Sequence, residues 1–167
     1  VIGSDQEYLL GQCNQLLVLA FLSSAGNQTK SKRGKEGASF TVDEAKVSRQ
    51  PGIVQQFPQG TKVTVGSAAT LMITMNDQTA FDLFVQRDRP SMEMFLDSLG
   101  LSGDRTLKPF LSTREYYQLT EKANRKLGLQ FLNADLKTRL GILEEIAKIE
   151  LIKYRRADTA LEVSIGS

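Results

Sequence analysis

The sequence predicts an α+β fold made of an N-terminal helix, a central, mostly antiparallel sheet of four to five strands, and a helical C-terminal half ending in a long amphipathic helix. Two changes of pattern predict it. Near Phe40 the apolar residues begin to alternate at a spacing of two, and after Asp88 they return to helical spacing. The length of 167 residues and the 41% hydrophobic content are typical of one globular domain. We therefore expect a single domain over residues 1–157, followed by a C-terminal arm or terminal strand over residues 158–167.

The N-terminal helix is predicted to begin at the capping box Ser4–Glu7 and to end near Gly26. Residues 27–39 are then rich in Gly, Ser and Thr and carry several positive charges, which predicts a flexible basic loop. Cys13 lies on the apolar stripe of the helix and is the one cysteine of the chain, so an intrachain disulfide is impossible. This favours a reducing intracellular compartment or a virion.

The predicted sheet occupies residues 40–86, where β-branched and aromatic residues are separated by turn residues. Pro51-Gly52 and Pro58-Gln59-Gly60 break the run, and Asn76-Asp77-Gln78 is interpreted as the turn of a hairpin. Such short links favour an antiparallel order of strands. The predicted strands are Phe40–Val47, Ile53–Phe57, Lys62–Val65, Thr70–Met75 and Thr79–Gln86.

Three helices are predicted after the sheet. Pro90 opens a short one that Gly100 ends, and a second capping box, Ser112–Glu115, begins a helix over Thr113–Leu127. The last helix, Asn133–Arg156, carries two apolar rows and therefore needs two neighbours. Either the rest of the domain fills both rows, or one row is a partner surface. The residues predicted for a partner interface are Ile142, Ile146 and Ile149 on this helix and Leu161, Val163 and Ile165 on the terminal arm.

The chain contains no histidine, which excludes Ser-His and Cys-His nucleophile pairs and the commonest general acid/base. It also contains no Ser-x-x-Lys pattern and no Gly-rich nucleotide-binding loop. We accordingly predict no catalytic residue, no metal site and no cofactor. The apolar run Leu16–Leu22 is too short for a membrane span, which needs about 20 residues.

These observations favour a non-enzymatic structural or assembly subunit that forms a homo-oligomer or docks into a larger complex, such as a viral particle or a secretion apparatus. The net charge of +2 gives no general attraction to nucleic acid, yet a local patch could bind phosphates. The alternative is therefore a nucleic-acid-binding module that uses the basic loop and the sheet surface. Its predicted contacts are Lys30, Lys32, Arg33, Lys35, Arg87 and Arg89. A third hypothesis is an enzyme that uses carboxylate and lysine chemistry.

Overall fold

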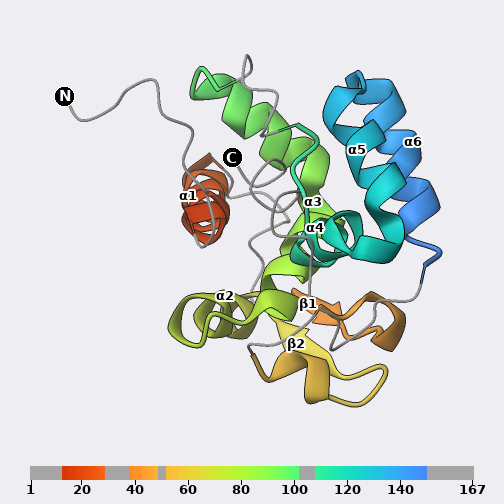
Figure 1. Ribbon diagram of the computed structural model, residues 1–167. Helices are drawn as coiled ribbons and strands as arrows, with labels where there is room; N and C mark the ends of the chain where they lie inside the picture. The colour runs from red at the N-terminus through yellow and green to blue at the C-terminus, as the bar shows by residue number, and fades with distance from the viewer. Residues whose placement is uncertain (1–12, 29–37, 49–51, 102–107, 150–167) are drawn as a thin grey trace.

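The computed structural model describes residues 13–28, 38–48, 52–101 and 108–149 (Figure 1). These residues are mostly helical, and the strands among them form one two-stranded antiparallel sheet. In chain order the elements are α1 (Cys13–Gln28), β1 (Ser39–Thr41), η1 (Glu44–Lys46), η2 (Val54–Gln56), β2 (Lys62–Thr64), α2 (Val65–Thr74), α3 (Gln78–Ser98), α4 (Thr113–Thr120), η4 (Lys122–Asn124), α5 (Arg125–Asn133) and α6 (Leu136–Ile146).

The predicted fold class, with its sheet of four to five strands, is wrong. Phe40 pairs with Val63 at the centre of the β1–β2 ladder, so strand is found at the start of one predicted segment and along Lys62–Thr64. The segment predicted as Ile53–Phe57 contains the 3-10 turn η2, and the last two predicted strands are helical. The chain therefore has a small hairpin where the sequence pattern predicted a meander.

Burial explains why α3 was mistaken for a strand. Every residue from Thr79 to Val85 is buried, including Ala80, Asp82 and Phe84, which lie between the residues of the alternating set. These first two turns of α3 are enclosed all round and have no polar face, so the helical spacing of 3.6 does not appear in this part of the sequence. The alternation of apolar residues over Thr79–Gln86 therefore arose by chance in a buried helix and does not indicate a strand.

Side-chain caps mark the starts of both missed helices. The Thr64 side chain accepts a hydrogen bond from the Ser67 N–H at the start of α2, and the Asp77 side chain accepts one from Ala80 N–H at the start of α3. Threonine and aspartate are favoured at this position because they satisfy a backbone donor that the first helical turn leaves unpaired. The predicted start at Pro90 is wrong because α3 continues through Pro90 for 21 residues in all.

The larger hydrophobic core surrounds α3, with α1 on one side and α2 and the hairpin below it (Figure 1). Edge-on aromatic pairs join these elements, with 4.9 Å between the ring centroids of Phe40 and Phe84 and 5.9 Å between those of Phe21 and Phe95. Such pairs contribute beyond the area they bury. The core thus brings the first half of the chain together around one helix.

The second core lies among α4, α5 and α6, which stand on the other side of α3. The predicted capping box is confirmed, since the Ser112 and Glu115 side chains each accept from the other residue's backbone N–H. The predicted helix Thr113–Leu127 instead ends at Thr120 and resumes as α5. Ile142 and Ile146 lie buried in this core, and Ile149 packs partly buried against it.

A buried arginine holds the break between α5 and α6, where one long helix was predicted. Asp135 caps α6, and the Arg139 guanidinium donates to the carbonyl oxygens of Phe131, Leu132 and Lys108. The bonds to Phe131 and Leu132 satisfy carbonyl groups at the end of α5, and the bond to Lys108 ties the break to the segment before α4. Residues 150–156 of the predicted helix lie outside the described residues. In the part of the chain that the structure describes, no helix is long and apolar enough to cross a membrane.

Candidate functional site at the α2–α3 turn

The turn between α2 and α3 holds the most constrained backbone outside the glycines. Asn76 has a φ of +52°, the left-handed conformation that non-glycine residues adopt uncommonly. Asparagine tolerates it better than most residues, but the conformation still costs energy that the surroundings must offset. Non-glycine residues in this conformation often lie at functional sites, so the turn is a candidate site.

The Asp77 carboxylate fixes this turn from the inside of the protein. It is fully buried, and its Oδ1 accepts from Ala80 N–H at 2.9 Å. Its Oδ2 accepts from Ile53 N–H at 2.6 Å and from Val54 N–H at 2.9 Å. Both oxygens therefore accept from backbone donors inside the protein, which assigns Asp77 a positioning role.

Gly52 allows the close approach between this carboxylate and the segment before η2. Its φ is +128°, and a Cβ added there would lie 2.4 Å from Asp77 Cγ. We expect Gly52→Ala to lower the free energy of unfolding by about 3 kcal/mol, from backbone strain and displacement of the carboxylate. Urea unfolding would measure it.

The matched control for that substitution is Gly60→Ala. Gly60 also has a positive φ, of +84°, but a Cβ there would meet nothing within 4 Å. The control therefore reports the cost of backbone strain without the clash. Equal losses in the two variants would contradict the role given to the Gly52–Asp77 contact.

Two carboxamide side chains, those of Gln15 and Asn76, meet where α1 contacts the turn. Gln15 Nε2 donates to Asn76 Oδ1 at 2.6 Å, joining residues 61 positions apart. Asn14 Oδ1 and Gln78 Oε1 are buried and have no hydrogen-bond partner among the described residues, while Gln78 Nε2 lies 3.5 Å from the Tyr117 hydroxyl. Unpaired buried acceptors are rare and call for a donor. The arrangement suits hydrogen bonding to a neutral polar group.

A serine hydroxyl near the turn is not accessible to a substrate. Ser48 is 3% exposed, its backbone N–H donates to Thr79 Oγ1 at 3.1 Å, and its own Oγ is buried without a partner among the described residues. Within the described residues there is also no group of three or more acidic or cysteine side chains that could hold a metal ion.

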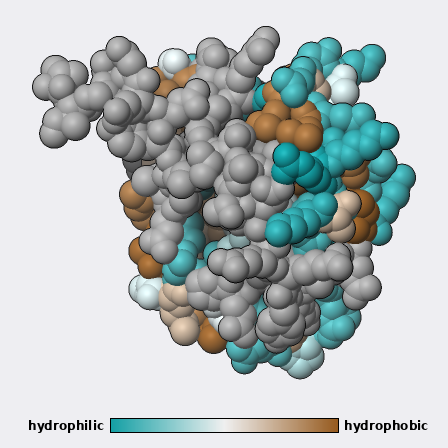
Figure 2. Space-filling view, viewed as in Figure 1, coloured by the Kyte–Doolittle hydropathy of each residue, from teal (hydrophilic) through white to brown (hydrophobic). Residues whose placement is uncertain are grey.

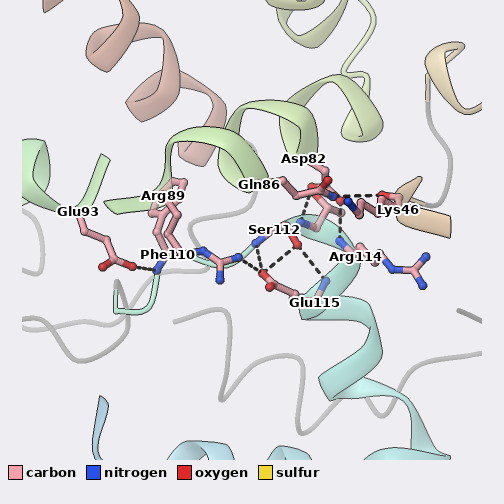
Figure 3. Close-up of polar contacts among 10 residues, drawn as sticks. Lys46, Asp82, Gln86, Arg89, Glu93, Phe110, Ser112, Arg114 and Glu115 are labelled. Atoms are coloured by element: carbon pink, nitrogen blue, oxygen red, sulfur yellow. Dashed lines mark hydrogen bonds and ion pairs between the residues drawn. The ribbon is translucent and has the colours of Figure 1, made fainter. Parts of the chain in front are cut away.

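A second polar network joins α3 to the start of α4 (Figure 3). The Asp82 carboxylate accepts from Thr113 N–H at 2.6 Å and from Arg114 N–H at 2.9 Å. Complete burial raises its pKa from 3.8 to about 7, because desolvation outweighs those two hydrogen bonds and the nearby Glu115 charge adds to the rise. Asp82 therefore keeps its proton to a much higher pH than an ordinary aspartate, and its contacts hold α3 to the start of α4.

The described arginines of the predicted phosphate site are engaged within the chain. The Arg87 guanidinium lies 4.1 Å from the centroid of the Phe40 ring and bonds Asp88 at 2.7 Å. Arg89 Nη2 lies 2.5 Å from Glu115 Oε2. Lys30, Lys32, Arg33 and Lys35 lie outside the described residues. The structure therefore brings the two arginines to separate acidic partners, and phosphate binding stays an untested prediction.

The residues of the predicted partner interface are also placed in part. Ile142 and Ile146 are 7% and 0% exposed and face Leu119 in the second core. Leu161, Val163 and Ile165 lie outside the described residues. The row of α6 that was assigned to a partner is thus the row that the chain itself covers, although binding of a partner remains untested.

Sequence reasoning missed the turn as a site, because it treated Asn76, Asp77 and Gln78 as a hairpin link between two strands. A signal was present. An aspartate directly before an apolar run is a favoured helix cap, and asparagine is among the residues most enriched at positive φ. Reading the flanking segments as strands hid both preferences.

Comparison with protein families matches residues 2–163 to the family model Beta-lactamase2, described as a beta-lactamase enzyme family. A search of curated proteins gave no match. Class A β-lactamases and penicillin-binding proteins use Ser-x-x-Lys, Ser-Asp-Asn and Lys-Thr-Gly motifs. The turn Asn76-Asp77-Gln78 agrees with the second motif at its aspartate, and neither of the other two motifs occurs in these 167 residues.

The family match overturns the prediction of a non-enzymatic structural subunit. It points to an enzyme of the beta-lactamase/penicillin-binding fold and gives no support to a virion, assembly or nucleic-acid role. The prediction failed because it gave too much weight to the missing histidine. Acyl transfer in this family is built on serine and lysine, and so the absence of histidine does not exclude it. An enzyme was the third hypothesis, and its carboxylate and lysine chemistry stays a prediction.

Proposed function

This chain belongs to the beta-lactamase enzyme family, and on that premise we propose that it is a hydrolytic enzyme that opens the amide bond of a β-lactam at the α2–α3 turn. The observation that carries the proposal is the extent of the match, residues 2–163 of 167. The turn supports the location, because it joins a positive-φ residue, a buried positioning carboxylate and one unpaired carboxamide oxygen, that of Gln78.

The geometry divides the work among the three residues of the turn. Asp77 accepts hydrogen bonds from three backbone N–H groups, which fixes the backbone of the turn. The Cα positions of its neighbours Asn76 and Gln78 are thereby fixed as well. The amide nitrogens of Asn76 and Gln78 can donate to a carbonyl oxygen of a bound acyl compound, whereas Asn76 Oδ1 already accepts from Gln15 Nε2. We assign Asn76 and Gln78 to substrate binding and Asp77 to positioning. Preorganised donors of this kind lower barriers without moving during the reaction.

The triplet departs from the family pattern in a way that affects the chemistry. Asn76 stands where the motif has serine, and a carboxamide cannot pass a proton as a hydroxyl can. Hydrolysis would then follow one of two routes: attack by a serine outside a Ser-x-x-Lys pattern, or direct attack by water. The routes differ in one observable, since the first attaches the opened ring to the protein as an ester and the second leaves the protein mass unchanged.

The test is hydrolysis of a chromogenic cephalosporin by the full chain, followed by intact mass spectrometry of the protein. We expect turnover above the rate in protein-free buffer, and a loss of about tenfold in kcat/KM for Gln78→Ala, as expected when a substrate hydrogen bond is removed. Gln130→Ala, an exposed change of the same kind on α5, is the control and should leave the rate unchanged. A rate equal to that in buffer, without a mass increase, would reject the proposal.

A further inference from the structure

The outer face of α6 exposes two leucines beside charged residues. Leu136 is 45% exposed and Leu140 is 40% exposed, whereas Ile142 and Ile146 on the opposite face are buried. Lys137 and Glu144 are exposed on this outer side, and neither makes an ion pair with another described residue. Figure 2 shows brown atoms set among the mostly teal surface of the α5–α6 region at the right. This face has apolar and charged groups with no partner in the described chain.

Gly141 lies in the middle of α6, and no contact with another described residue explains why a glycine stands there. Gly141 is exposed, and a Cβ added there would meet nothing within 4 Å. Glycine destabilises an exposed helix interior relative to alanine because it loses more backbone entropy on folding. Gly141 therefore weakens the helix without making room for any described residue. Its presence is explained if another molecule packs against α6 at this position.

The order of residues on this face is self-complementary. Lys137 and Glu144 are two helical turns apart, with Leu140 and Gly141 midway between them. A second α6 lying antiparallel, with a two-fold axis between residues 140 and 141, brings each Lys137 opposite Glu144 of the second copy. The same axis places each Leu140 beside Leu140 of the other copy and each Gly141 opposite the other Gly141, where the missing side chains allow close approach of the helix axes, near the lower limit of about 8 Å.

We propose that the outer face of α6 is a docking surface for a second copy of this chain, built as an antiparallel, two-fold helix pair. Two-fold contacts use the same patch on both partners, which is what the Lys137–Glu144 spacing provides. Contact through one short helix is small compared with stable interfaces, which bury about 1,200–2,000 Å². The dimer is therefore weak and forms at high protein concentration.

Sedimentation equilibrium of the full chain, from micromolar to millimolar concentration, tests this directly. We expect reversible dimerisation, at least a tenfold weaker association in Lys137→Glu and in Glu144→Lys, and restored association in the double variant, where the two charges are exchanged. Lys126→Glu and Glu145→Lys make the same charge changes at exposed positions outside the pairing and should associate like the parent.

Gly141→Ala gives a second, independent readout. The two methyl groups should weaken dimerisation because they meet where the two Gly141 residues let the helices approach closely, while the thermal midpoint of the dilute monomer should rise with the better helix former. A parent chain that stays monomeric at millimolar concentration would overturn the proposal. So would a double charge variant that associates no better than the single ones.

Discussion

Replacing Asp77 by alanine is expected to be the most destabilising single substitution at the α2–α3 turn. The substitution removes the cap of α3 and leaves the backbone N–H groups of Ile53 and Val54 without an acceptor, the second of them in a fully buried residue. A lost cap costs about 1 kcal/mol and each unpaired buried donor about 1–3 kcal/mol. We expect the free energy of unfolding to fall by roughly 4–5 kcal/mol, measured by urea unfolding followed by circular dichroism.

Asp135→Ala is the matched control, because Asp135 caps α6 in the same way but is exposed and accepts from Thr138 N–H at its own helix. It should lose far less stability. If Asp77→Ala unfolds at the same urea concentration as Asp135→Ala, the carboxylate does not hold the Ile53 segment to the turn as the structure indicates.

The second large effect is a dependence of stability on pH through Asp82. Its pKa in the folded protein, about 7, lies above the ordinary value of 3.8. Between these values the folded state keeps a proton that the unfolded state has released, so raising the pH destabilises the fold until the pKa of about 7 is passed. We expect the Asp82 contribution to fall by about 3 kcal/mol between pH 5 and pH 8, seen as a falling urea midpoint.

Asp82→Asn isolates this contribution, because an amide does not titrate in this range and keeps one oxygen for the Thr113 or Arg114 N–H. The variant should lose stability at every pH, and its midpoint should change less than that of the parent between pH 5 and pH 8. Parallel pH profiles for parent and variant would show that the titrating group is another residue.

Where a local signal decided the structure, sequence reasoning succeeded. The Ser112–Glu115 capping box starts α4 as predicted, and Lys62–Thr64 is a strand within its predicted bounds. It failed where tertiary packing decided. Burial of the first two turns of α3 on all sides hid the helical period, and Arg139 bonds the Lys108 carbonyl, 31 positions away, besides those of Phe131 and Leu132 at the break between α5 and α6. Neither effect has a signature in a short sequence window.

The site was less predictable than the fold. Its contacts join residues far apart in sequence, such as Gln15 with Asn76 and Val54 with Asp77, and Asp77, the one residue of a usual catalytic type among them, was interpreted as part of a hairpin turn. The amino-acid composition predicted that the protein is not an enzyme, because the chain has no histidine. Composition does not show which side chains lie close together in the fold. The family match supplied the enzyme class, and the location at the α2–α3 turn is our proposal.

The contact between α1 and the turn is made by two side chains that carry no charge at any ordinary pH, Gln15 and Asn76. A neutral hydrogen bond has no ion atmosphere to lose, so added salt does not screen it as it screens an exposed ion pair. The wall that α1 forms beside the turn should therefore keep its shape in buffers of very different ionic strength. If the affinity of a ligand falls as salt is added, the change then comes from the ligand's own charge contacts. Measuring affinity against ionic strength therefore tells whether a bound compound is held by charge or by shape.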